Sequence, residues 1–254
     1  TAKVGSITAN AAQVAGTGFS AGKDVTVAAV AIAGTEILAG GIVILDGINR
    51  AMGIITNNSV SNFGDVIIKN AEWADNNTVT TAGNITVSSV QILAGGEYVA
   101  SKAINLGTED DKLIHIVDAS FTGDSLAAFA NLDLTGNTVR VDSAANVTAG
   151  NAIANNNILV TAGDATLTAA ELFGANTITV NGTLTLNGAA PIVGNTIETI
   201  GDITITEAAY TANNNIATAG AFSIDIAGNM TNDLVTAAGA ATVKANFVSG
   251  LQLD

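Results

Sequence analysis

The sequence reads GDATLT at 163–168, GTLTLN at 182–187, GDITIT at 201–206, GAFSID at 220–225 and GAATVK at 239–244. Each segment begins with Gly and then alternates apolar with polar residues, and each starts 19 positions after the one before it. Alternation with a period of two is typical of a β-strand that buries one face. A fixed repeat of this size is typical of a solenoid, in which each turn of the chain stacks on the last.

The same pattern extends toward the N-terminus, with GDVII from Gly64 and GNITV from Gly83. The spacing from Gly83 to Gly163 exceeds four repeats by four positions, so we expect an insertion near 108–111. The spacing from Gly41 to Gly64 exceeds a single repeat by the same amount, which predicts a second insertion near 46–56. Insertions in solenoids form loops on one face, where recognition often takes place.

This spacing divides the chain into about thirteen coils, with a weak register in residues 1–40. Two columns of apolar residues are expected to face a common interior, because strand side chains of like parity share a face. The first column should hold Leu45, Ile68, Val87, Leu106, Phe129, Thr148 or Val147, Leu167, Leu186, Ile205, Ile224 and Val243. The second should hold Val60, Val79, Tyr98, Phe121, Val139, Leu159, Ile178, Ile197, Ile216 and Val235.

A polar column precedes the second apolar one. It is predicted to contain Asn58, Asn77, Gly96, Asp118, Asn137, Asn157, Asn176, Asn195, Asn214 and Asn232. Asparagine tolerates the left-handed backbone of a tight corner, and stacked carboxamides can hydrogen-bond along a ladder. The column therefore indicates a corner repeated in successive coils.

These patterns predict an all-β fold, a single parallel β-helix over residues 1–254 with about thirteen coils of about 19 residues. The strand segments are rich in Val, Ile and Thr, which favour extended structure. Stacked coils would satisfy their backbone hydrogen bonds at a spacing of about 4.8 Å. No linker or second domain is visible in the sequence.

The 19-residue period, the Gly-Asn-Ile-Thr-Val and Gly-Asp-Ile-Thr-Ile segments and the Asn or Gly corners together resemble a known family. It is the right-handed parallel β-helix of filamentous-haemagglutinin-like adhesins and autotransporter passenger domains. The likeness covers most of residues 41–254. It implies a secreted, surface-associated and adhesive role, and it carries no catalytic residue to this chain.

Composition excludes several classes of function. The chain has 22 acidic and 8 basic residues, a net charge of −14, and its basic residues form no cluster. Nucleic acid is therefore not an expected partner, because phosphate binding needs a basic surface. The longest apolar stretch, 27–33, is too short to cross a bilayer, so we expect no membrane insertion. The absence of Cys excludes disulfides and thiol chemistry.

Candidate sites are few, and we predict no catalytic, cofactor-binding or metal-binding residue. His115 is the only histidine, and with no Cys it cannot form a zinc site by itself. The acidic run 109–111 could bind calcium weakly, although a solvated loop is the simpler interpretation. Asn84 and Asn229 begin Asn-x-Thr sequences, which have little weight without a known host.

Two other functional classes remain as alternatives. A polysaccharide-active enzyme would need convergent carboxylates, but Asp65, Asp164 and Asp202 alternate with Asn84, Thr183 and Ala221, and only Arg50 and Arg140 could bind acidic sugars. An ice-binding face would need a regular array of threonines. Thr86, Thr166, Thr168, Thr185, Thr204, Thr206 and Thr242 suggest such an array, which Lys69, Asp225 and Lys244 interrupt.

The sequence thus predicts a non-catalytic extracellular structural protein at a bacterial surface. The coil pattern continues to the last residues without a recognisable cap, so we expect uncapped ends that stack head to tail into a homopolymer. The alternative is a passenger fragment of a larger secreted adhesin. Expected partners are further copies of the chain and surface glycans or proteins of a host or neighbouring cell.

Overall fold

The computed structural model describes residues 1 and 5–253, which form a parallel β-solenoid of about 13 turns. The predicted fold class is therefore confirmed. The described part of the chain contains strands and no helix, so it offers no helix that could span a membrane. The chain divides into two compact units, residues 1–131 and 132–254, each described by itself.

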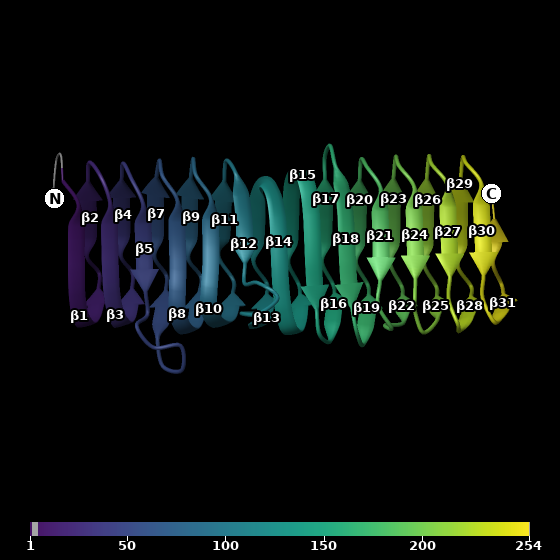
Figure 1. Cartoon of the computed structure of the whole chain (residues 1–254), viewed down its shortest axis with the longest axis horizontal. Coiled ribbons are helices and arrows are strands. Elements are labelled where there is room, and N and C mark those ends of the chain that lie inside the picture. Colours follow the sequence, from purple (N-terminus) through teal and green to yellow (C-terminus); the bar gives the residue numbers. More distant parts are fainter. Residues whose placement is uncertain (2–4, 254) are drawn as a thin grey trace. The chain divides into compact units, whose positions relative to one another are not determined.

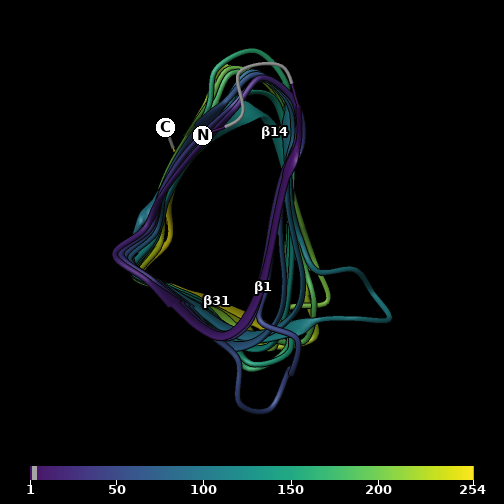
Figure 2. The same ribbon diagram turned by 90° about the vertical axis from the view of Figure 1, so that its left-hand side faces the viewer.

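Each coil has three sides, and every side carries parallel strands from successive coils (Figures 1 and 2). In the first unit, four long strands cover both the first and the second side: β1 (Ile7–Ala15), β3 (Val25–Ala33), β8 (Val66–Asp75) and β10 (Ile85–Ala94). Where a loop is inserted the two sides have separate strands: β5 (Val43–Asp46) and β6 (Ile54–Thr56), then β12 (Ala103–Leu106) and β13 (Leu113–Val117). The third side holds β2 (Gly18–Ala21), β4 (Glu36–Ala39), β7 (Ser59–Asn62), β9 (Thr78–Thr81), β11 (Glu97–Ala100) and the start of β14 (Ser120–Thr135).

The second unit repeats this arrangement with shorter strands. Its first side holds the end of β15 (Thr138–Ala149), β18 (Asp164–Ala169), β21 (Leu184–Asn187), β24 (Ile203–Thr206), β27 (Phe222–Asp225) and β30 (Ala241–Lys244). Its second side holds the end of β14, β16 (Ala152–Ala154), β19 (Leu172–Gly174), β22 (Ile192–Val193), β25 (Thr211–Ala212), β28 (Asn229–Thr231) and β31 (Phe247–Ser249). Its third side holds the start of β15, β17 (Asn157–Val160), β20 (Thr177–Val180), β23 (Thr196–Thr199), β26 (Asn215–Thr218), β29 (Leu234–Ala237) and β32 (Gln252–Leu253).

Strand pairing explains why the register is weak near the N-terminus. Ile7 pairs with Val25, and Val25 with Val43, so each of these coils is one residue shorter than the regular repeat. The next pairing joins Val43 to Val66, and that coil is longer than the repeat because a loop is inserted between β5 and β6. Loops without strand structure lie at 47–53 and 107–112, near the predicted insertions at 46–56 and 108–111.

The apolar columns fill the interior of each unit, and most predicted members are buried. Two assignments were wrong by one residue. Val139 pairs with the buried Ile158, so Leu159 lies on the outer surface. Leu106 pairs with Ala128, which is buried in place of Phe129. Of the two candidates for the first column at this coil, Thr148 and Val147, the structure places Val147 in the column: it pairs with Leu167 and is buried.

The predicted asparagine column combines residues from three successive positions of the coil. One is a corner residue with positive φ, held by Gly16, Gly34, Asn57, Asn76, Gly95, Asp118, Gly136, Asn155, Ala175, Gly194, Asn213, Asn232 and Gly250. The residue after each corner points inward. Asp118 and Asn232 are thus corner residues and Asn157 is an exposed strand residue, and the inward positions belong to Ala119, Asn156 and Asp233. Runs of consecutive polar residues at these corners hid which of them faces inward.

The inward asparagines form a hydrogen-bonded ladder. In the second unit, Asn156 donates from its backbone N and its Nδ2 to Oδ1 of Asn176, at 3.0 Å each. Its Nδ2 also donates to the carbonyl oxygen of Leu134 at 3.0 Å. The same bonds recur from Asn176 to Asn195 and from Asn195 to Asn214, and the ladder ends at Asp233. Every polar atom of a repeating rung is therefore satisfied although the side chain is buried.

Candidate interaction surface at the inserted loops

The two inserted loops are the main departures of the first unit from a regular coil. Loop 47–53 connects β5 to β6, and loop 107–112 connects β12 to β13. Both occupy the corner between the first and second sides, and both project beyond the neighbouring coils (Figures 1 and 2). A solenoid tolerates such loops at a corner because the paired strands on either side keep their register.

Arg50 joins the two loops. Its Nη1 lies 2.8 Å from Oδ1 of Asp111, and its Nη2 donates to the carbonyl oxygen of Lys112 at 3.1 Å. Gln91, from one of the two coils between the loops, donates from Nε2 to the carbonyl oxygen of Arg50 at 2.9 Å. The other carboxylate oxygen of Asp111 accepts from the backbone N and the Oγ of Ser89, at 2.6 and 2.9 Å. The loops therefore form one structure, which we call the Arg50–Asp111 bridge.

Asp46 fixes the start of the first loop. Its Oδ1 accepts from the backbone N of Ile48 at 2.8 Å and from Nδ2 of Asn70 at 3.0 Å, and its Oδ2 lies 3.2 Å from Nζ of Lys69. Burial alone would raise the pKa of Asp46, but these hydrogen bonds and the lysine charge together hold that pKa below its usual value. The carboxylate is therefore favoured in the folded chain.

Large apolar side chains are exposed beside the bridge. In the first loop Ile48 is 52% exposed and Met52 is 59% exposed. Ile54 and Trp73, on the adjacent second side, are each 42% exposed, and they are paired neighbours in β6 and β8. Exposed apolar groups gathered at one place indicate an interaction site more than scattered ones do.

The residues considered and set aside as sites in the sequence take ordinary structural places. His115 is a half-buried strand residue of β13 paired with Ile92. In the acidic run 109–111, the carboxylate of Asp111 accepts hydrogen bonds from Arg50 and Ser89. Within residues 1 and 5–253, no group of three or more His, Asp or Glu residues is placed to hold a metal ion.

The aspartates that follow the repeated glycines each bind the next coil. Oδ1 of Asp65 accepts from the backbone N of Asn84 at 2.8 Å, and Oδ1 of Asp164 accepts from that of Thr183 at 2.7 Å. Asp24 and Asp202 make the same bond to Ile42 and Ala221. A carboxylate in every coil of one column would place like charges about 4.8 Å apart, which alternation with uncharged residues avoids.

The outward threonines of the second unit lie in register. Thr166, Thr185 and Thr204 are successive partners on the first side, followed by Ser223 and Thr242. In the parallel column, Lys244 and Asp225 form an ion pair of 2.8 Å. Charged residues thus interrupt this array, as expected from the sequence.

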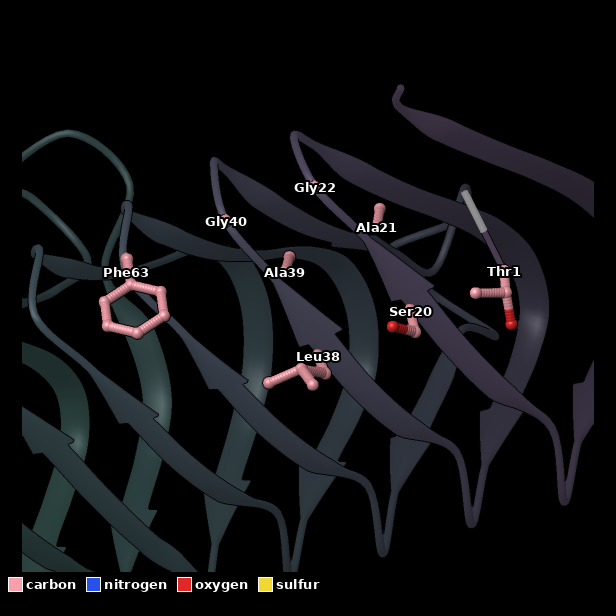
Figure 3. A pocket seen from close by; sticks show the side chains of 8 residues that line it. All are labelled: Thr1, Ser20, Ala21, Gly22, Leu38, Ala39, Gly40 and Phe63. Carbon is pink, nitrogen blue, oxygen red and sulfur yellow. The ribbon is translucent and has the colours of Figure 1, made fainter. Parts of the chain in front are cut away.

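A shallow hollow of about 370 Å³ lies at a corner of the first unit (Figure 3). Phe63, 76% exposed, and Leu38, 53% exposed, form its apolar rim, with Ser20 and Thr1 beside them. None of the side chains that line it is titratable. The hollow therefore offers no side chain for acid–base chemistry.

Comparisons with known protein families, curated proteins and solved structures find no match to this chain. Functional inference therefore depends on the geometry. The sequence located both loops but not the contact between them, since Arg50 and Asp111 are 61 residues apart. Their opposite charges, on two insertions at the same corner, are the only sequence signal that could have suggested it.

Proposed function

We propose that this chain is a non-catalytic, extracellular structural protein that forms part of a bacterial surface filament or adhesin. Its coils would extend head to tail from copy to copy, and the inserted loops would face outward. The observation that carries the proposal is that the last described coil presents exposed apolar side chains at interior positions, on strands that pair in parallel with the coil before.

Side chains of that coil have interior positions but lie open. Val248 is 41% exposed and Leu253 is 51% exposed, whereas their strand partners Met230 and Val235 are fully buried. Edge strands with apolar side chains are templates for further pairing. Another coil stacked on this surface would bury them.

The first coil has the dimensions needed for that contact. Ile7 pairs with Val25 and Leu234 pairs with Gln252, so the first and last coils have the same length, whereas most coils between are longer by at least one residue. In a head-to-tail stack, Val14 would lie over Val248 and Phe19 over Leu253. Such a contact is heterologous and produces an open filament.

Electron microscopy of the purified 254-residue chain tests assembly. We expect fibres that lengthen with protein concentration, and short fibres or none for Val248→Lys, because a charge would be buried at the contact. Ile200→Lys is the matched control, since Ile200 is 61% exposed away from the coil end. Uniform short particles at every protein concentration would contradict filament formation.

The surface location is tested separately. Antibodies against the chain should label intact cells of the source organism without permeabilisation. Labelling that needs permeabilised cells would overturn the extracellular role, whatever the purified chain assembles into.

A further inference from the structure

The second side of the first unit has an apolar outer surface. Strand pairing places Ile54, Trp73, Ile92 and His115 in one outward column across four successive coils. We call these four residues the Trp73 stripe. The outward column of the third side instead reads Glu36, Ser59, Thr78, Glu97 and Ser120.

The second side of the other unit shows the same preference. Leu172, Tyr210 and Phe247 stand at equivalent outward positions and are 39%, 45% and 59% exposed. Four aromatic side chains are exposed among the described residues. Three of them lie in second-side strands or directly before one: Trp73, Tyr210 and Phe247. Aromatic residues presented on a rigid sheet are the usual anchors of protein interfaces.

Two carboxylates lie close to Trp73 in the sequence of its own strand. Glu72 directly precedes Trp73, and Asp75 holds the second outward position of the same strand. In the described strands of this side, from β6 to β13, no outward position is Lys or Arg. The nearby guanidinium of Arg50 is already bound to Asp111 and to the Lys112 carbonyl. An incoming cation would therefore meet two carboxylates and the exposed Trp73 side chain, with no lysine or arginine on the stripe.

We propose that the Trp73 stripe is a docking surface for a basic, extended segment of a partner protein. Lysine or arginine side chains of that segment would lie against Trp73 and near the carboxylates of Glu72 and Asp75. Cations bind the face of an indole ring by its quadrupole, with Trp the strongest of the aromatic residues. The net charge of −14 would steer a basic partner toward the chain over a longer distance.

The proposal rests on the adhesive role suggested above, but it does not depend on filament formation. A chain that stays as short particles can still bind a basic segment, and a filament can form without binding one. The bridged loops beside the stripe supply Ile48 and Met52 as further apolar surface at one edge.

Trp73 is the only tryptophan of the chain, so its fluorescence reports directly on this surface. We would titrate the full chain with a synthetic peptide of alternating lysine and serine, with the same peptide carrying glutamate for lysine, and with a neutral oligosaccharide. The lysine peptide should change the emission to saturation, and added salt should weaken binding because charge pairs are screened. The other two ligands should leave the emission unchanged.

Variants separate the stripe from general charge attraction. Glu72→Gln with Asp75→Asn should weaken peptide binding roughly tenfold by fluorescence, and Trp73→Ala by a similar factor by calorimetry. The matched controls are Glu97→Gln with Glu198→Gln, which removes the same charge from third-side strands, and Phe63→Ala, which removes an exposed ring elsewhere. Circular dichroism checks that each variant is folded.

Three results would overturn the proposal. Equal weakening by the control charge variants would mean non-specific attraction to an acidic protein. Binding of the oligosaccharide in place of the peptide would assign the stripe to glycans. A lysine peptide that leaves the Trp73 emission unchanged would mean that a basic segment does not dock there.

Discussion

The two units satisfy their buried corners in different ways. The second unit has an unbroken ladder from Asn137 to Asp233, in which each inward side chain accepts hydrogen bonds from the asparagine of the preceding coil. In the first unit the ladder runs from Thr35 to Asn77 and stops at Gly96. A Cβ at Gly96 would lie 2.4 Å from the Asn77 carbonyl oxygen, so no asparagine can stand there without a backbone shift.

Beyond that point the inward corner positions hold Gly96 and Ala119, and two aromatic side chains pack in the neighbouring column of the third side. The rings of Tyr98 and Phe121 stack with centroids 5.5 Å apart and an angle of 22° between their planes. Both side chains are buried. The comparison indicates that the inward corner position accepts either a complete amide ladder or an apolar filling. A rung missing from the middle of a ladder should be the most costly arrangement, because its neighbours lose their partners.

Replacing a middle rung should therefore have the largest effect. Asn176→Leu would remove, in a buried site, the partner of the Asn156 backbone N, one of the two acceptors of the Asn156 Nδ2 and the donor to the Ile153 carbonyl oxygen. Each unsatisfied group costs about 1–3 kcal/mol, so we expect a loss of about 4 kcal/mol in the free energy of unfolding. Urea denaturation followed by circular dichroism measures it.

Asn157→Leu is the matched control, because Asn157 is exposed and directly follows a rung of the ladder in the sequence. Its free energy of unfolding should change by less than about 0.5 kcal/mol. If the two variants were equally stable, the ladder would contribute nothing specific, and the two units would not differ in the way described.

Tyr98→Phe tests the apolar filling of the first unit, and it should stabilise the chain. Among the described residues, the Tyr98 hydroxyl is buried without a hydrogen bond of good geometry, although Asn77 lies near enough to affect its ionisation. Removing an unsatisfied buried hydroxyl should raise the free energy of unfolding by about 1 kcal/mol in urea denaturation at neutral pH. A loss of stability would mean that the hydroxyl does bond to Asn77.

The same variant predicts a pH dependence. Burial raises the pKa of Tyr98 above its ordinary value, and the Asn77 side chain offsets only part of that effect. The phenol is therefore neutral in the folded chain while it ionises near pH ~10 in the unfolded chain. Its contribution to stability is complete below that pH and declines as the pH rises further. Tyr98→Phe should remove this part of the alkaline decline in urea denaturation.

Asp233→Asn should have a smaller effect than Asn176→Leu, because the shape of the last rung is kept. Asp233 accepts from the backbone N and Nδ2 of Asn214 at 2.9 and 2.8 Å and from Oγ1 of Thr211 at 2.8 Å. Hydrogen bonds to a charged group are stronger than those between neutral groups. We therefore expect the free energy of unfolding, measured by urea denaturation, to fall by about 1 kcal/mol. A gain in stability would show instead that the cost of burying the charge exceeds these bonds.

The sequence predicted the repeat, the coil number and both insertions, because these depend on spacing and on the alternation of apolar residues. It failed by one residue where polar residues follow each other, as at Asn155, Asn156 and Asn157. Which of three adjacent asparagines turns inward depends on backbone φ, and a sequence pattern does not encode it. The Arg50–Asp111 bridge was missed for a related reason, since the path of an inserted loop is set by contacts between coils.

The smallest expected change in stability concerns Ala175, which is a corner residue. It has a φ of 53° in a column otherwise held by Gly, Asn or Asp, so its Cβ is strained in the left-handed region. Ala175→Gly removes that strain of about 1–2 kcal/mol but gives the unfolded chain more freedom, worth about 0.4–1 kcal/mol. The net gain should be about 0.5 kcal/mol, measured as a shift in the urea midpoint. Ala165→Gly, at a buried strand position, is the control and should destabilise the chain. If both glycines destabilised it equally, the corner would impose no strain on alanine.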